Sequence, residues 1–147
     1  MNIRSLLPAD IPPCAALFSA VFSSPPWNEN WTLENAHRRL ADCAATTHFI
    51  GMIAENEQGP AGFAVGYLQH YMDERHYFLL ELCVETSRQR QGVGGALMAA
   101  LTTRLKEAGA TRAYTLTARE TAAQAFYEKA SFYVSPKMIL MAQRFTS

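Results

Sequence analysis

The chain lacks a long hydrophobic run, has little cysteine and carries no net charge. Its 147 residues include three cysteines, 13 basic and 13 acidic side chains. No apolar run approaches the roughly 20 residues that a membrane-spanning helix needs. The N-terminus shows no secretory hydrophobic segment followed by a small-residue cleavage site. We therefore expect a cytoplasmic protein that does not bind membranes.

The three cysteines, Cys14, Cys43 and Cys83, are far apart and lie in apolar surroundings. An odd, scattered set is not typical of a disulfide framework or a zinc site. The four histidines show no metal-ligand spacing either, so we expect no metal. We interpret the cysteines as reduced, buried thiols, and a catalytic Cys83 is the alternative. Because the charges cancel, nothing attracts nucleic acid globally, and any anion site must be local.

Hydrophobic periodicity predicts a single mixed α/β domain over residues 1–147, without repeats or linkers. The expected helices cover about 12–22, 33–43, 92–108 and 119–130, with Asp10 and Thr32 as N-caps of the first two. The expected strands are 2–6, 48–55, 61–70, 76–85 and 111–118, followed by a final pair at 132–136 and 137–143.

Connection lengths predict how these strands pair. Short connections make 48–55, 61–70 and 76–85 antiparallel neighbours. The crossover helix makes 111–118 parallel to 76–85. Glycines within 61–70 indicate a bulge or a close approach. The prediction is a central, mostly antiparallel sheet with one parallel βαβ pair, flanked by about four helices.

A glycine-rich loop follows the apolar strand 76–85 and leads directly into a helix. Glycines at such a junction expose the first N–H groups of the helix, which have no partner within it. The helix dipole adds partial positive charge there, and such an N-terminus binds phosphate. The residues concerned are Gln89, Arg90, Gln91, Gly92, Val93, Gly94 and Gly95, with Arg88 beside them. A plain glycine turn with solvated arginines is the alternative.

The loop does not fit the common nucleotide motifs. A Walker loop requires a lysine after its last glycine, and none is present. A dinucleotide fingerprint requires a third glycine where this chain has Leu97, and an acid about 20 residues later. The loop is therefore unlike both nucleotide-binding motifs, although a nucleotide-binding domain stays a rival interpretation.

Glu81 is the one carboxylate among seven apolar or aromatic side chains, Tyr77 to Leu80 and Leu82 to Val84. A buried acid must be paired, raise its pKa or face a cleft. In a cleft, Glu81 can take a proton from an amine, directly or through water, or bind a cationic substrate. The alternative is a structural glutamate bonded to backbone or to the first helices.

Two motifs together resemble a known family. Gln89–Gly94 resembles the Gln/Arg-x-x-Gly-x-Gly/Ala motif of the GNAT superfamily of acyl-CoA-dependent N-acyltransferases. The stretch "TAAQAFYEKASF", about 35 residues later, resembles the family's next motif. The resemblance is detailed over 76–134, and the element order of the whole chain agrees with it. Two departures are Glu120, where the family often has asparagine, and Ser131, where it usually has glycine.

The resemblance implies a GNAT fold that holds acetyl-CoA between two splayed strands, 76–85 and 111–117. The pantetheine arm would pair with the backbone of Leu82, Cys83 and Val84, and the pyrophosphate would lie on the N–H groups between Gln89 and Gly95. Glu120 occupies a further coenzyme-contacting position. Val84 N–H would serve as the oxyanion donor.

The resemblance also implies the roles of the acid and of the acceptor site. Tyr127 corresponds to the family's tyrosine, which points at the coenzyme sulfur, and it is our general acid; the alternative is a core tyrosine. The front segment offers Trp27, Glu29, Trp31 and Glu34 as an aromatic, acidic lip for an ammonium group. Two tryptophans that anchor the loop to the core are the equal alternative.

The sequence thus predicts an acetyl-CoA-dependent N-acetyltransferase that works by direct attack of a primary amine in a ternary complex. The acceptor is an amine-bearing small molecule or a protein amine. Family members are often dimers, so a homodimer is a further expectation by analogy. The rivals are an enzyme of this fold with another acyl group and a non-catalytic acyl-CoA-binding sensor.

Overall fold

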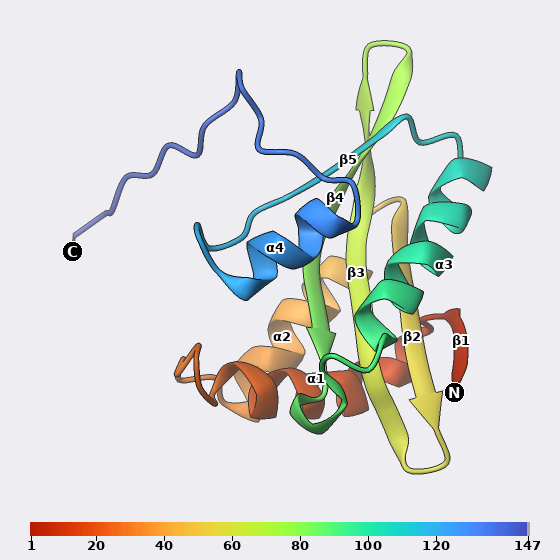
Figure 1. Cartoon of the computed structure of the whole chain (residues 1–147), viewed down its shortest axis with the longest axis vertical. Coiled ribbons are helices and arrows are strands. Elements are labelled where there is room, and N and C mark those ends of the chain that lie inside the picture. The colour runs from red at the N-terminus through yellow and green to blue at the C-terminus, as the bar shows by residue number, and fades with distance from the viewer. Residues whose placement is uncertain (147) are drawn as a thin grey trace. The chain divides into compact units, whose positions relative to one another are not determined.

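The computed structural model, which describes residues 1–146, contains a five-stranded mixed sheet in the order β1-β2-β3-β4-β5 (Figure 1). All neighbours are antiparallel except β4 and β5, which run parallel. The strands are β1 Asn2–Ser5, β2 Phe49–Asn56, β3 Gly59–Tyr71, β4 Glu74–Val84 and β5 Arg112–Thr115. The helices are α1 Ile11–Phe22, α2 Leu33–Ala44, α3 Val93–Glu107 and α4 Ala122–Lys129, with short 3-10 turns at Pro8–Asp10 and Thr86–Arg88. The predicted mixed α/β sheet is confirmed.

The chain forms two compact units, Met1–Leu116 and the residues from Thr117 onward. The first unit holds the sheet and α1 to α3, and the second holds α4. A single functional domain over the whole chain stays a prediction.

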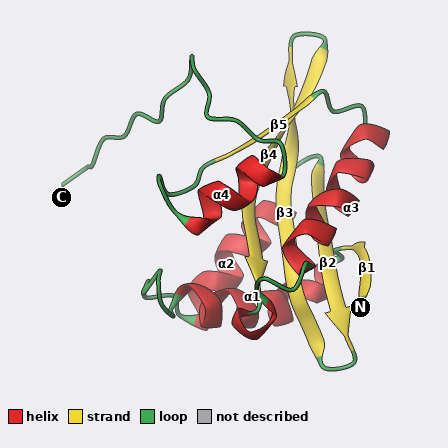
Figure 2. Ribbon diagram, in the orientation of Figure 1, coloured by secondary structure: helices red, strands yellow, loops and turns green. Residues whose placement is uncertain are grey.

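The strand β3 separates two helical layers of the first unit (Figure 2). Successive side chains of a strand point to opposite faces. Phe63 and Val65 belong to the buried cluster that α1 and α2 form on one face. Gly62 faces α3, because a Cβ there would lie 3.0 Å from Leu97 and 3.3 Å from Val93. The glycine thus lets α3 approach the sheet closely.

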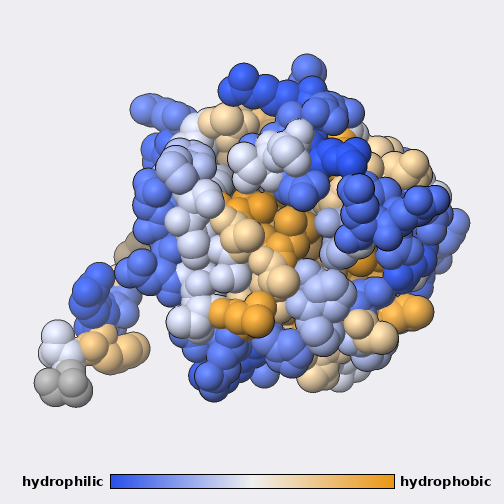
Figure 3. Space-filling view, turned by 90° about the horizontal axis from the view of Figure 1, so that it is seen from below, coloured by the Kyte–Doolittle hydropathy of each residue, from blue (hydrophilic) through white to orange (hydrophobic). Residues whose placement is uncertain are grey.

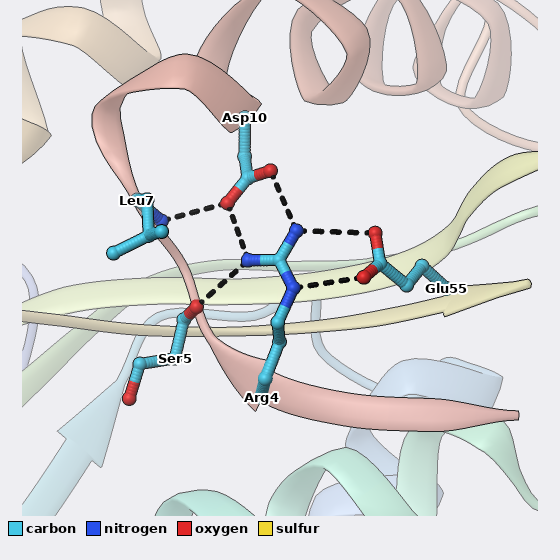
Figure 4. A network of polar contacts seen from close by, with 5 residues as sticks. All are labelled: Arg4, Ser5, Leu7, Asp10 and Glu55. Carbon is cyan, nitrogen blue, oxygen red and sulfur yellow. Dashed lines mark hydrogen bonds and ion pairs between the residues drawn. The ribbon is translucent and has the colours of Figure 1, made fainter.

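Arg4 joins the N-terminal strand to the start of α1 (Figure 4). Its guanidinium donates to both carboxylate oxygens of Asp10, at 2.8 and 2.9 Å, and to Glu55 at 2.8 Å. Asp10 also accepts from Leu7 N–H at 2.7 Å. The hydrogen bonds from Arg4 lower the pKa of Asp10 below its ordinary value.

Asp10 is the N-cap residue of α1, as predicted, but its side chain makes no capping hydrogen bond to this helix. Its carboxylate is already occupied by stronger, charge-assisted donors. The other predicted cap is confirmed, since Thr32 Oγ1 accepts from Asn35 N–H at 3.0 Å. The prolines lie in the first turn of α1 as expected.

A β-bulge interrupts the pairing of β3 with β4. Val65 pairs with Glu81 and Gly66 pairs with Leu79, so Leu80 is an extra residue on β4. Gly66 is required there, because a Cβ would lie 2.0 Å from Phe78 O and 2.7 Å from the Tyr77 hydroxyl. The close approach predicted from the glycines of β3 is confirmed.

The parallel strands β4 and β5 separate at the level of this bulge. Their pairing runs from His76 with Arg112 to Leu79 with Thr115, and β5 ends there. Thr115 Oγ1 donates to Leu79 O at 2.9 Å and closes the ladder. Beyond the bulge, β4 has a strand neighbour on the β3 side alone within the part of the chain that the structure describes.

The second unit begins with a capped helix. Thr121 accepts from Gln124 N–H at 3.2 Å, so α4 starts at Ala122 and not at residue 119. Glu120 adopts a left-handed φ of 59° just before this cap. After the helix, Ser131 adopts a φ of 72°, which lies in the left-handed region that favours glycine.

The final pair of strands predicted at 132–136 and 137–143 is absent, because no sheet pairing among residues 1–146 extends past Thr115. Ser135 Oγ accepts from Lys137 and Met138 N–H groups and bends the chain. Apolar side chains exposed here include Met138, Ile139, Leu140 and Met141. Without a neighbouring strand to pair with, an apolar run does not form a strand.

In the face that Figure 3 shows, apolar residues are visible in the middle and hydrophilic ones occupy most of the rim.

Candidate active site

The loop after β4 exposes backbone donors at the start of α3. Gly92 is the N-cap residue, and its φ of 86° lies in the left-handed region that favours glycine. Ala96 N–H makes the first bond of the helix, to Gly92 O at 3.0 Å. The N–H groups of Val93, Gly94 and Gly95 precede it and have no intrahelical partner. A Cβ at Gly92 or Gly95 would meet nothing within 4 Å, so there is open space beside both glycines.

Side chains of the loop hold it in place. Gln89 Nε2 donates to Val84 O at 3.1 Å, and Gln91 Nε2 donates to Ser87 O at 3.0 Å. Arg88 lies 3.7 Å from Glu85. Arg90 has a φ of 65° and no ion pair among residues 1–146. The loop thus offers bare amides and a cation, which suit a phosphate group. We call Arg90 to Gly95 the cradle.

The β4 residues beyond the bulge lie between the cradle and the point where the two strands part. Leu82 and Val84 are half-buried, whereas Cys83 is 1% exposed. Burial raises the pKa of the Cys83 thiol well above its ordinary value. An activated nucleophilic cysteine needs the opposite shift. The structure therefore favours the interpretation of Cys83 as a packed core residue.

Glu81 is paired with Arg39 of α2. Arg39 Nε donates to Glu81 Oε1 at 3.0 Å, and Nη2 lies 2.9 Å from the same oxygen. Burial raises the pKa of Glu81, although Arg39 opposes the shift. A contact with the first helices is what a structural glutamate would make. The role of Glu81 as a base stays a prediction.

A pocket of about 420 Å³ lies on the face of the sheet that α2 covers. Its size is within the range of small-molecule sites. Leu80, the bulge residue, forms part of its wall, so the pocket reaches the level at which β4 and β5 part. The lining residues are Trp31, Asn35, Arg38, Arg39, Asp42, Cys43, Thr46, Tyr67 and Leu80. We call this the acceptor pocket, because we propose below that the acceptor binds here.

Of the four predicted acceptor residues, Trp31 alone lines this pocket. Its ring packs edge-on against Phe18, with centroids 4.8 Å apart. Trp27 contacts Phe22 at 5.3 Å. Both tryptophans therefore anchor the front loop to α1, as the alternative interpretation expected. Roles for Glu29 and Glu34 in binding stay predictions.

Tyr127 and Glu120 belong to the second unit. Tyr127 lies on α4, with its ring 5.2 Å from Phe126 and 5.3 Å from Phe132. Glu120 N–H donates to Gln124 Oε1. The acid role of Tyr127 and the coenzyme contact of Glu120 stay predictions.

The sequence analysis missed the polar side chains that α2 gives to the pocket. Asn35, Arg39 and Asp42 recur at intervals of four and three residues, which places them on one helix face, and Thr46 follows just after the helix ends. Such a stripe ordinarily indicates a solvent-exposed face. The stripe was visible in the sequence, but its position beside Glu81 was not.

Comparison with known proteins gives a consistent result. The model of the acetyltransferase (GNAT) family matches residues 15–132. A search of curated proteins found no match. No helix within residues 1–146 has the length and apolarity to span a membrane, and no group of three or more potential metal ligands occurs among them.

Solved structures share the fold at low sequence identity. A probable acetyltransferase is 18% identical, with a TM-score of 0.82 over 100% of this chain and 99% of that one. Aminoglycoside N-acetyltransferase AAC(6')-Iy in complex with CoA is 19% identical, with a TM-score of 0.75 over 98% and 95%. Aminoglycoside acetyltransferase meta-AAC0020 with sisomicin, from an uncultured soil metagenomic sample, is 20% identical, with a TM-score of 0.73 over 99% and 96%.

Proposed function

The chain belongs to the GNAT acetyltransferase family, and from this premise we propose that it transfers the acetyl group of acetyl-CoA to a primary amine by direct attack in a ternary complex. The observation that carries the proposal is the pair of features on β4. The strand parts from β5 at Leu80, and it then leads into the cradle of bare amides. We place this activity in the cytoplasm.

The residues present fit coenzyme A. The N–H groups of Val93, Gly94 and Gly95 would bind the pyrophosphate, with Arg90 as a nearby cation. The β4 edge offers backbone groups of Leu82 and Val84, on either side of Cys83, to the pantetheine arm, because β5 ends at Thr115. Gln89 and Gln91 support this loop. Glu120 is the proposed further contact.

The chemistry requires three tasks of the protein. The amine must lose its proton, and Glu81 takes it directly or through a water molecule. Val84 N–H donates to the carbonyl oxygen as negative charge develops there. The C–S bond then breaks, and the phenol of Tyr127 donates its proton to the leaving thiolate. Because a thiol has a pKa of about 8.5, this last help is modest.

Two solved structures of the same fold support the proposed acceptor class. The two aminoglycoside acetyltransferases of this fold act on compounds that carry amines. This supports a small-molecule amine as acceptor, and a protein amine is the broader possibility.

Thiol release from acetyl-CoA with a panel of primary amines tests the proposal. We expect turnover, and we expect Tyr127→Phe to lower kcat by about tenfold to a hundredfold with little change in acetyl-CoA affinity. Calorimetry with coenzyme A provides the independent binding measurement. Tight coenzyme binding without turnover on any amine would instead identify a non-catalytic acyl-CoA sensor.

A further inference from the structure

The carboxylates predicted to attract an ammonium group already have donors. Glu29 Oε1 accepts from Trp31 Nε1 at 2.8 Å. Glu34 pairs with Arg38 at 2.9 Å. A cationic acceptor would have to compete with these contacts. These contacts leave fewer free acceptor positions for an ammonium group, although Glu29 and Glu34 keep their negative charges, and this bears on the acceptor of the proposed acetyl transfer.

Arg39 places a guanidinium at the wall of the acceptor pocket. Glu81 occupies its Nε and Nη2, whereas its Nη1 has no partner within the described chain. The group lies 5.9 Å from the centre of the Trp31 ring, and the side chain is 38% exposed. Glu81 and Trp31 thus fix a planar cation with one edge still able to donate.

The other side chains of the pocket are mixed in character. Trp31, Tyr67 and Leu80 give an apolar and aromatic wall. Asp42 is the one acid among the lining residues, and no ion pair within residues 1–146 engages it. The pocket therefore presents two arginines and one acid beside an apolar wall, which does not match a ligand with several positive charges.

We propose that the acceptor is a small amine that also carries a carboxylate, and that Arg39 Nη1 binds this carboxylate in the acceptor pocket. The inference rests on the proposed function, because it names the substrate class of the same site. A guanidinium binds carboxylate through charge-assisted hydrogen bonds. Amino-acid-like compounds are the corresponding chemical class.

Turnover of matched acceptors tests this inference. The probes are ω-amino carboxylates from β-alanine to 6-aminohexanoate, each compared with its primary amide, together with spermidine. We expect at least one carboxylate to exceed its amide tenfold or more in kcat/KM, and to exceed spermidine. Equal or better use of the amides or of spermidine overturns the inference, while the measured turnover still supports acetyl transfer.

Variants of the two adjacent arginines locate the contact. Arg39→Gln should lower the ratio of kcat/KM for the preferred carboxylate to kcat/KM for its amide about tenfold to a hundredfold, whereas the lost pairing with Glu81 affects both acceptors alike. Arg38→Gln is the matched comparison, since that side chain is 64% exposed and paired with Glu34. An equal loss for acid and amide in Arg39→Gln, or a loss of preference in Arg38→Gln alone, contradicts the assignment.

Two further measurements distinguish loss of the carboxylate contact from a folding defect and from an absence of acetyl transfer. Arg39→Lys keeps the charge but loses the planar fork, and it should show an intermediate preference. Coenzyme A affinity checks that each variant is folded. If no amine is acetylated, acetyl transfer fails. Calorimetry of the same acid and amide pairs on coenzyme-loaded protein then still tests the carboxylate contact, and equal heats overturn it.

Discussion

The cradle and the acceptor pocket recognise their ligands in different ways. The cradle is a short stretch of consecutive residues, and its donors are backbone N–H groups left open by the start of α3. The pocket is assembled from the front loop, α2, β3 and β4, and Arg39 in its wall pairs with Glu81 across 42 positions of sequence. Coenzyme recognition is therefore local and general, whereas acceptor recognition depends on tertiary pairing.

The largest expected effect is the loss of stability on substitution of Gly66. This glycine permits the bulge that places Leu80 in the pocket wall. In Gly66→Ala the new Cβ would lie 2.0 Å from a backbone oxygen, so the strand pairing must shift. We expect a loss of about 3 kcal/mol or more in the free energy of unfolding. Urea denaturation measures it.

The control for Gly66→Ala is Gly95→Ala, where the added methyl group meets nothing within 4 Å. That variant should be neutral or more stable by up to about 1 kcal/mol, because alanine favours a helix. Similar losses in both variants would show that the bulge does not constrain Gly66.

Sequence reasoning succeeded where a short segment determines its own structure. The glycines from Gly92 to Gly95, the Thr32 cap and the short turns between β2, β3 and β4 each act over a few residues. Together they predicted the mixed sheet and the bare helix start. The glycines of β3 also indicated the bulge, although not that Leu80 is its extra residue.

The second prediction concerns the cradle. Gly95→Glu places a carboxylate beside the proposed pyrophosphate position without filling occupied space. Repulsion between like charges a few ångströms apart should weaken coenzyme A binding about tenfold to a hundredfold. Calorimetry measures the Kd, and Gly95→Gln is the matched neutral control. Equal affinities of the two variants would place the diphosphate elsewhere.

The errors of sequence reasoning came from partners that are distant in the chain. Asp10 matches the pattern of a helix cap, but Arg4 and Leu7 occupy its carboxylate. Glu81 is isolated among apolar neighbours in sequence, yet Arg39 reaches it from α2. The apolar residues 137–143 have strand composition but no ladder to join. Composition does not reveal which donor or strand arrives from elsewhere.

The smallest expected effect is a difference in how stability depends on pH. It distinguishes the two ion pairs that arginines of α2 form, Arg39 with Glu81 and Arg38 with Glu34. Burial raises the pKa of Glu81 above the unfolded value of 4.5, so the folded state binds more protons. The stability that this contributes is complete below pH 4.5 and is lost as pH rises through the folded pKa. Glu81→Gln removes this dependence, so its Tm should rise relative to that of the wild type as the pH is raised from 4 to 7. Glu34→Gln alters an exposed pair, and such pairs add little to stability, so its curve should parallel that of the wild type. Parallel curves for both variants would mean that Arg39 fully compensates the burial of Glu81.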